Sequence, residues 1–292
     1  MTSCKKDHDK PVEVSVDYHK TAKTQFLNVG DAKIAYRVLG DQPGIPLIMV
    51  SALASSMDDW DPAVTNGFAS KNKVILFDME GVASSTGTTP NSIQDMAKGV
   101  VTIIKSLGYS RVNLMGFSMG SFISQQIALT EPNLVNKIIL TGTGPKGATG
   151  LSNLPNLLAG AAGLSREDSF LKFAFTSSAA SIAAGKAAWL RTQERTVDHD
   201  VELSAEAGAA ELTAVLGWAQ PDPKALDELK TVKQPVLIAQ GAEDLAVPVI
   251  NAQNMSKNLP NVKLIIYQDA GHAAFFQFYD QFVTSANDFL KN

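Results

Sequence analysis

The sequence predicts an α/β protein with a doubly wound, mostly parallel sheet and a helical cap inserted between two of its strands. Continuous apolar runs, typical of strands covered on both faces, occur at residues 46–50, 74–77, 111–115, 137–140, 235–239 and 262–267. Stretches with helical periodicity separate several of these runs, and this alternation favours a parallel sheet. Residues 146–232 interrupt the alternation because they are rich in alanine and contain no convincing strand.

The first elements of the core are expected to be a hairpin and then alternating strands and helices. Residues 24–29 and 32–38 read as two strands around a Gly30-Asp31 turn. Ser92 and Asp95 give a capping-box signal for a helix over 92–107, and Gly108 follows it. Further helices are expected after three of the later strands, at residues 121–129, 249–259 and 273–290.

These elements divide the chain into three parts. Residues 1–23 are polar and are expected to be a flexible N-terminal tether. Residues 24–145 and 233–292 form the α/β core, and 146–232 form the helical cap. The cap contains aromatic side chains that are candidate walls of a pocket: Phe170, Phe173, Phe175, Trp189 and Trp218.

The composition limits the possible partners and cofactors. The 292 residues are 45% hydrophobic and carry a formal net charge of −4. No basic run is longer than Lys5-Lys6, which argues against a nucleic-acid partner, and no apolar stretch is long enough to span a membrane. One cysteine excludes an internal disulfide, and the scattered histidines give no zinc-ligand spacing. Nucleotide-binding fingerprints are also absent from the sequence, so we expect neither a metal nor a cofactor.

The cysteine lies near the N-terminus in a suggestive context. Thr2-Ser3-Cys4, followed by two lysines, resembles the end of a bacterial lipobox, in which a cysteine is lipidated after cleavage. Met1 stands where a leucine is usual, and no apolar signal segment precedes it in this sequence. Two interpretations therefore stay open: an exported or lipid-anchored protein that contacts the membrane only through Cys4, and a cytoplasmic protein.

The most informative motif is Gly116-Phe117-Ser118-Met119-Gly120, a G-x-S-x-G pentapeptide. An apolar strand precedes it and a helical pattern follows it, which is the context of a nucleophile elbow. Such a turn holds the serine in a strained conformation, and side chains at positions 116 or 120 would collide with the neighbouring backbone. Ser118 is therefore the candidate nucleophile.

The elbow resembles that of the α/β-hydrolase superfamily, and residues 26–290 can be aligned with that pattern. A serine nucleophile needs a histidine base and a carboxylate that orients it. His272 follows the last strand, and Gly241-Ala242-Glu243-Asp244 begins a loop that matches the family's G-x-x-D-x-x-x-P pattern. The resemblance implies a catalytic triad of Ser118, His272 and Asp244, while Glu243 stays an alternative acid.

The resemblance also implies an oxyanion hole formed by the backbone N–H groups of Leu53 and Met119. Relatives commonly carry His-Gly after the third strand, whereas this chain has Ser51-Ala52. A second departure is that relatives usually have arginine at the position of Glu80 and glycine at that of Ala83. An alanine at position 52 restricts the turn more than a glycine would, so the geometry of the hole is the question that the sequence raises.

The function implied by the resemblance is a serine hydrolase that acts on a small or medium acyl ester through an acyl-enzyme. Serine at the elbow argues against dehalogenase and epoxide-hydrolase chemistry, which use a carboxylate nucleophile in this superfamily. Relatives with the same triad are carbon–carbon bond hydrolases or cofactor-free haloperoxidases and perhydrolases, and both stay open as alternatives. A non-catalytic ligand-binding module of the same fold is the third, because fold alone does not establish activity.

Overall fold

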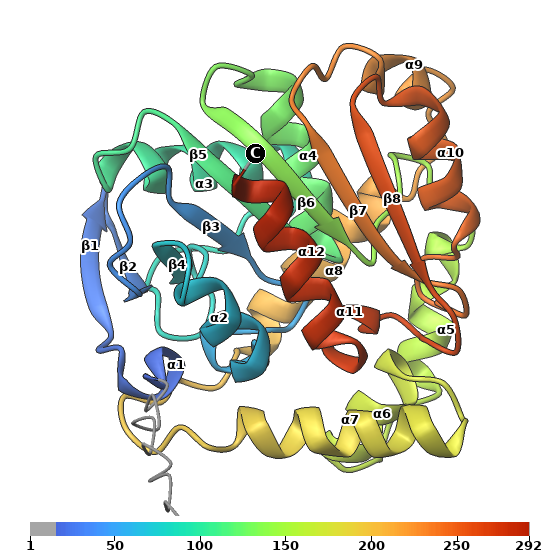
Figure 1. Cartoon of the computed structure of the whole chain (residues 1–292), viewed down its shortest axis with the longest axis horizontal. Helices are drawn as coiled ribbons and strands as arrows, with labels where there is room; N and C mark the ends of the chain where they lie inside the picture. The colour runs from blue at the N-terminus through green and yellow to red at the C-terminus, as the bar shows by residue number, and fades with distance from the viewer. Residues whose placement is uncertain (1–15, 292) are drawn as a thin grey trace, which may run out of the picture.

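The computed structural model describes residues 16–291, so Cys4 and its lipobox-like context lie outside the described residues. In this range, eight strands form one sheet (Figure 1). The strands are β1 (Gln25–Val29), β2 (Ala32–Leu39), β3 (Leu47–Val50), β4 (Val74–Phe77), β5 (Val112–Phe117), β6 (Val135–Thr141), β7 (Val236–Gly241) and β8 (Val262–Tyr267).

The order of the strands places a topological switch point next to the elbow. The order is β1-β2-β4-β3-β5-β6-β7-β8; β2 pairs antiparallel with β1 and β4, and all other pairs are parallel. The chain leaves β3 toward β4 on one side, whereas β5 lies on the other side of β3. The carboxyl ends of β3 and β5 are therefore adjacent at the point where ligands bind in open α/β sheets.

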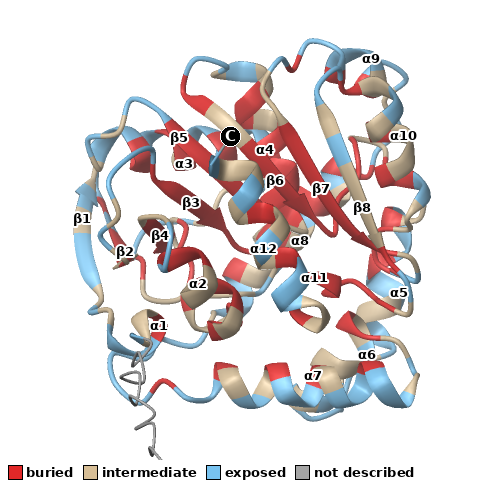
Figure 2. Cartoon of the chain, in the orientation of Figure 1, coloured by how far each residue is buried: buried red, intermediate tan, exposed pale blue. Residues whose placement is uncertain are grey.

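Helices cover both faces of the sheet, as the continuously apolar strands predict (Figures 1 and 2). In β3, Ile48 and Val50 belong to one buried cluster, and Leu47 and Met49 belong to the other. The first cluster includes α3 (Ile93–Ser106), α4 (Met119–Thr130) and α10 (Ile250–Asn258), and the second includes α2 (Pro62–Ala69), α11 (Ala274–Gln277) and α12 (Tyr279–Lys291). The predicted doubly wound sheet is confirmed.

The last predicted helix, 273–290, is interrupted in the structure. Phe278 has φ −110° and ψ 38°, which ends α11 before α12 begins. Its ring stacks on Tyr267 of β8, with centroids 5.2 Å apart. The break lets α11 contact β7 and the cap helix α7 (Ala179–Thr192), while α12 packs on α2. Periodicity alone could not show this change of direction.

The segment between β6 and β7 is helical, as expected for a cap. After a short 3₁₀ turn (Leu151–Asn153) it forms α5 (Leu154–Ala159), α6 (Arg166–Ala174), α7 (Ala179–Thr192), α8 (Ala205–Trp218) and α9 (Ala225–Leu229). Figure 1 shows α6 and α7 side by side beneath the sheet. Arg191 of α7 donates from Nε and Nη2 to the two carboxylate oxygens of Asp61, at 2.7 and 2.6 Å. Since Asp61 is buried and caps α2, this pair fastens the cap to the core.

The N-terminal boundary differs from the expectation of a tether that extends to residue 23. Residues Tyr18–Thr21 form α1, and His19 is buried against α2. The His19 backbone N–H donates to Asn66 Oδ1 at 2.7 Å, and the His19 carbonyl accepts from Arg195 of the cap at 2.6 Å. The expectation is therefore wrong for these residues: a buried histidine with backbone contacts to both core and cap anchors the segment.

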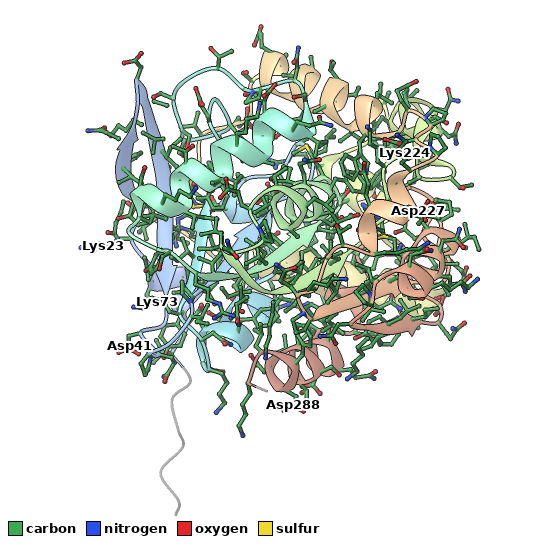
Figure 3. The ribbon with its side chains drawn as sticks, turned by 90° about the horizontal axis from the view of Figure 1, so that it is seen from above. Lys23, Asp41, Lys73, Lys224, Asp227 and Asp288 are labelled. Carbon is green, nitrogen blue, oxygen red and sulfur yellow. The ribbon has the colours of Figure 1, made fainter. Side chains whose placement is uncertain are left out.

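Charged side chains lie mainly around the periphery of the described part of the chain. Figure 3 shows Lys23, Asp41 and Lys224 projecting from the surface, and all three are exposed. Within residues 16–291, no helix has the length and apolar character to cross a bilayer. The same residues contain no cluster of histidine, cysteine and acidic side chains suited to a metal ion.

Candidate active site

Ser118 occupies a strained turn between β5 and α4. Its φ of 52° and ψ of −116° lie in a region that non-glycine residues rarely adopt. A Cβ atom on Gly116 would lie 2.2 Å from the carbonyl oxygen of Gly120, and one on Gly120 would lie 2.0 Å from that of Val50. Both glycines are therefore required by close backbone contacts, as the pentapeptide predicts. The second contact also brings the loop after β3 against the elbow.

His272 and Asp244 meet at the carboxyl edge of the sheet, on loops that follow β8 and β7. The Nδ1 atom of His272 lies 2.8 Å from Oδ2 of Asp244, and both side chains are buried. An ionised carboxylate can only accept, so Nδ1–H is the donor and Nε2 carries the lone pair. Nε2 is buried and has no hydrogen-bond partner among the described residues. The imidazole is therefore oriented by one nitrogen and available as a base through the other.

Three further donors fix the carboxylate of Asp244. The backbone N–H groups of Ala246 and Val247 donate to Oδ1 at 2.9 and 2.8 Å. The side-chain amide of Gln240 donates to Oδ2 at 2.7 Å and to the Val247 carbonyl at 2.8 Å. Gln240 is fully buried in β7, and no sequence motif identified it as a site residue. A polar residue at the end of an otherwise apolar strand was the available signal.

The imidazole of His272 is confined on three sides. The ring of Phe117 lies 5.1 Å from it between centroids, and Phe173 of the cap meets it edge-on at 5.4 Å. On the third side is Gly142, whose φ is +56° and where a Cβ would lie 2.7 Å from Cε1 of the ring. Gly142 follows β6, the strand whose loop holds no carboxylate. A glycine at this position leaves room for the imidazole of His272.

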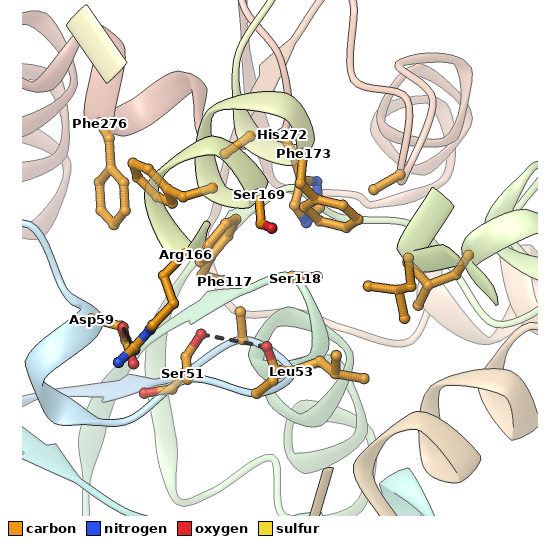
Figure 4. A pocket seen from close by; sticks show the side chains of 18 of the residues that line it. Ser51, Leu53, Asp59, Phe117, Ser118, Arg166, Ser169, Phe173, His272 and Phe276 are labelled. Atoms are coloured by element: carbon orange, nitrogen blue, oxygen red, sulfur yellow. Dashed lines mark hydrogen bonds and ion pairs between the residues drawn. The ribbon is translucent and has the colours of Figure 1, made fainter. Parts of the chain in front are cut away.

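Ser118 and His272 line the same cavity, which has a volume of about 440 Å³ (Figure 4). The loop after β3 forms one wall through residues 51–56, and the cap forms the opposite wall. Leu53 lines this cavity, and Met119 directly follows Ser118 at the first position of α4. The N–H groups at the start of a helix have no partner within the helix, so that of Met119 can bind an anion.

The other histidines and the alternative acid lie elsewhere. Glu243 is exposed, although it neighbours Asp244 in the chain. His19 is buried beside Thr65, and burial together with the nearby Arg37 lowers its pKa to about 4. His199 is exposed, and its Nδ1 lies 3.4 Å from Asp58. Of the histidines in the described part of the chain, only His272 lines the cavity with Ser118.

Residues 45–279 match the sequence model of the alpha/beta hydrolase fold. This chain belongs to the α/β-hydrolase fold family. An alpha/beta hydrolase fold protein from Chitinophaga pinensis is 36% identical in sequence, with a TM-score of 0.90 over 93% of this chain and 98% of that one.

Two curated relatives are more distant. One is provisionally named carbamate hydrolase RutD, from Caulobacter sp. (strain K31); it is 25% identical over 84% of this chain and 90% of its own length. A poly(3-hydroxyalkanoate) depolymerase from Ectopseudomonas oleovorans is 29% identical over 68% of each chain. These similarities place the chain among the hydrolases of this fold.

As a member of the α/β-hydrolase family, the chain departs from the usual pattern at two turns that the structure explains in part. Ala83, where relatives carry glycine, has a φ of 46°, so glycine would adopt this conformation without strain. Ser51, where relatives carry histidine, is buried and accepts a hydrogen bond from Trp60 Nε1 at 3.0 Å. The side chain at position 51 thus helps to hold the loop after β3 through its hydrogen bond with Trp60.

The walls of the α/β-hydrolase cavity are largely apolar. Among the aromatic candidates, Phe170, Phe173 and Trp189 line it, whereas Phe175 and Trp218 do not. Trp218 instead stacks on Phe122 of α4, with centroids 5.6 Å apart. Side chains that the sequence did not single out complete the walls, chiefly Leu151, Leu154, Leu158, Leu164 and Phe276.

Proposed function

We propose that the protein is a serine esterase in which Ser118, His272 and Asp244 form the catalytic triad. The observation that carries this proposal is the imidazole of His272. One of its nitrogens bonds to Asp244 at 2.8 Å, and the other is buried without a hydrogen-bond partner among the described residues. The side chain lines the cavity that also contains the strained Ser118. A base that is oriented and desolvated in this way is what activates a serine hydroxyl.

The chemistry follows from these roles. Ser118 Oγ attacks the ester carbonyl while Nε2 of His272 takes its proton, and the N–H groups of Leu53 and Met119 bind the oxygen that becomes negative. The imidazolium then returns the proton to the leaving alkoxide, which leaves an acyl-serine. Water attacks the acyl carbon and gives a proton to Nε2, and this proton passes back to Ser118 as the acid departs. Asp244 stabilises the imidazolium in both halves.

The shape of the cavity supports an acyl substrate of small or medium size. A volume of about 440 Å³ lined chiefly by leucine and aromatic side chains accommodates an apolar acyl group. Polar side chains come from the loop after β3 and, in the cap, from Arg166, Ser169 and Thr192. The named activities of the two curated relatives, on carbamates and on polyhydroxyalkanoates, both involve attack on a carbonyl that bears a heteroatom. Acyl transfer to water is the reaction class that these share.

Labelling with a fluorophosphonate tests the proposal. Wild-type protein is expected to react stoichiometrically at Ser118 and to lose turnover of p-nitrophenyl esters in step, whereas Ser118→Ala removes both. His272→Ala is expected to suppress labelling nearly as far, because members of a triad act as a unit. Labelling without ester turnover would favour the carbon–carbon hydrolase or perhydrolase alternatives, and folded protein that fails to label would support a non-catalytic binding module.

The acyl preference has its own test in the cap. Trp189 lines the cavity, and the next residue of the same helix, Leu190, is 66% exposed. Trp189→Ala is expected to move the preferred p-nitrophenyl ester to a longer chain by several carbons, with the rate of fluorophosphonate labelling little changed. Leu190→Ala is the matched control and should keep the wild-type profile. Identical profiles for both variants would place the acyl site elsewhere.

A further inference from the structure

A buried acid of the cap contacts the loop that follows β3, and the proposed triad does not use it. Glu211 lies in α8 and is fully buried. Its Oε2 atom accepts a hydrogen bond from the backbone N–H of Ala54 at 2.7 Å, and its Oε1 atom has no partner among residues 16–291. Burial raises the pKa of this carboxyl to about 7. Such a group is costly to bury, so its position calls for a reason.

Ala54 is the next residue after Leu53, whose N–H is assigned to the oxyanion hole. Its φ is +58°, in the left-handed region that an alanine adopts only against a cost in free energy. The conformation persists only if neighbouring groups hold it. The hydrogen bond from Ala54 N–H to Glu211 is such a restraint, and it is directed by a side chain that cannot move into solvent.

The restraint acts on Leu53 because the peptide group between the two residues is planar. Fixing the direction of the Ala54 N–H fixes that plane, and with it the ψ angle of Leu53. On the other side, the Ser51 hydroxyl accepts from Trp60 at 3.0 Å, and the elbow packs against the carbonyls of Val50 and Ser51. The Leu53 N–H is thus held between a contact from the core and a contact from the cap.

We propose that Glu211 is a positioning residue for the oxyanion hole, acting through Ala54 N–H to hold the Leu53 amide in its anion-binding orientation. The inference rests on the proposed acyl-transfer function. It explains how a loop that carries Ser51-Ala52 in place of His-Gly keeps the geometry that a hydrolase needs. It also makes α8 of the cap a part of transition-state stabilisation, in addition to forming a wall of the cavity.

Three variants separate this role from a general contribution to the core. Glu211→Gln keeps a side-chain oxygen that can accept from Ala54, so its kcat is expected to stay within about threefold of wild type. Glu211→Leu removes the acceptor at similar volume, and kcat is expected to fall by roughly 10- to 100-fold with KM little changed, since loss of a whole oxyanion donor costs about 10²–10³. Glu206→Leu alters an exposed acid of the same helix and should match wild type.

Inhibition by a trifluoromethyl ketone that matches the best ester supplies the decisive readout. This compound forms a tetrahedral adduct whose oxyanion uses the hole, so its Ki is expected to rise in Glu211→Leu by the same factor by which kcat/KM falls. The Ki of a primary alcohol of the same chain length, which carries no anionic oxygen, should stay unchanged. Circular dichroism and thermal unfolding establish that each variant is folded.

The possible results are distinguishable. Wild-type protein that neither labels at Ser118 nor turns over esters defeats the proposed function, and this inference with it. Active wild-type protein whose Glu211→Leu variant keeps kcat, or loses affinity for both inhibitors equally, overturns the positioning role alone. If Glu211→Leu does not fold, the Glu211→Gln variant decides. Its side-chain oxygen can still accept from the Ala54 N–H, so a folded Gln variant whose kcat is reduced more than tenfold contradicts the positioning role.

Discussion

A methyl group added to Gly142 should displace the proposed base, His272, without changing any residue of the proposed triad. Gly142 has a φ of +56°, and a Cβ there would lie 2.7 Å from Cε1 and 3.0 Å from Nδ1 of His272. The ring cannot withdraw freely, because Phe117 and Phe173 pack against it and Nδ1 is bonded to Asp244 at 2.8 Å. Gly142→Ala therefore pushes the imidazole away from its position in the cavity that Ser118 also lines.

The size of the effect follows from this contact. The 2.7 Å separation is about 0.7 Å short of the 3.4 Å at which ordinary van der Waals contact begins. Misplacement of a catalytic group by about 1 Å costs on the order of 10²-fold in rate, so we expect kcat/KM to fall by roughly 10- to 100-fold. The alanine also adopts a left-handed conformation, which lowers the free energy of unfolding by about 1 kcal/mol.

Gly30→Ala is the matched control. Gly30 has a φ of +57°, yet a Cβ there would meet no atom within 4 Å. Both variants should lose similar stability in thermal unfolding, but only Gly142→Ala should lose activity in p-nitrophenyl ester turnover and fluorophosphonate labelling. Equal kcat/KM for Gly142→Ala and wild type, or equal losses in the two variants, would refute the argument that His272 is the base held against this glycine.

Three further predictions concern the acid, the cap and the N-terminal segment. Asp244→Asn should lower kcat by about 10⁴-fold by favouring the wrong imidazole tautomer, whereas Glu243→Gln, at the exposed neighbour, should leave ester turnover unchanged. Arg191→Ala leaves the buried Asp61 without its bidentate partner and should lower the free energy of unfolding by about 2 kcal/mol in urea titrations. The pKa of His19 is lowered from 6.5 to about 4, so as the pH falls the unfolded state binds a proton at this histidine before the folded state does. The free energy of unfolding should therefore fall by up to about 3 kcal/mol between pH 6.5 and pH 4. His19→Gln should reduce this loss in unfolding curves recorded across that range.

The fold could be predicted from the sequence because apolar runs, helical periodicity and turn motifs are local signals. Apolar runs without alternation specify strands that are buried on both faces, and the structure shows them in a parallel sheet covered on both sides. The elbow was equally readable from its pentapeptide, and the steric limit at Gly116 does act within five residues, whereas that at Gly120 comes from the backbone of Val50 and Ser51. His272 was predicted from its place after a strand, because parallel strands end at one edge of a sheet. Asp244 was predicted from the resemblance of its loop to the family's G-x-x-D-x-x-x-P pattern.

Long-range contacts account for what the sequence did not show. Gln240 bonds to Asp244 from within an apolar strand, and Glu211 reaches Ala54 across 157 positions of the chain. Neither residue belongs to a sequence motif whose spacing would identify it as part of the site. The anchoring of His19 likewise depends on Arg195 of the cap, so a polar segment that resembles a tether is held in place by a distant partner. Periodicity predicts which face of an element is buried, but not which polar group meets another.

Backbone strain in this protein is concentrated where the chemistry is proposed. In the described part of the chain, five non-glycine residues have positive φ, and four of them follow the carboxyl ends of strands: Ala54 after β3, Ala83 after β4, Ser118 after β5 and Asp269 after β8. Such conformations persist only where surrounding contacts over-determine them, and they cluster at functional sites. The geometry of the proposed site at the carboxyl edge of the sheet therefore depends on the contacts that hold these turns.

The cap supplies part of that support. Ala54 is held by Glu211, and the carboxylate of Asp269, in the turn that leads to His272, accepts hydrogen bonds from Thr176 and Ser178 of the cap, each at 2.7 Å. Two of the four strained turns are thus restrained by residues outside the α/β core. A cap that only closed the cavity could be exchanged between relatives and change acyl preference alone. Because these contacts reach the turns on either side of Ser118, exchange of this cap should lower the rate of acylation as well, unless the three cap residues are retained.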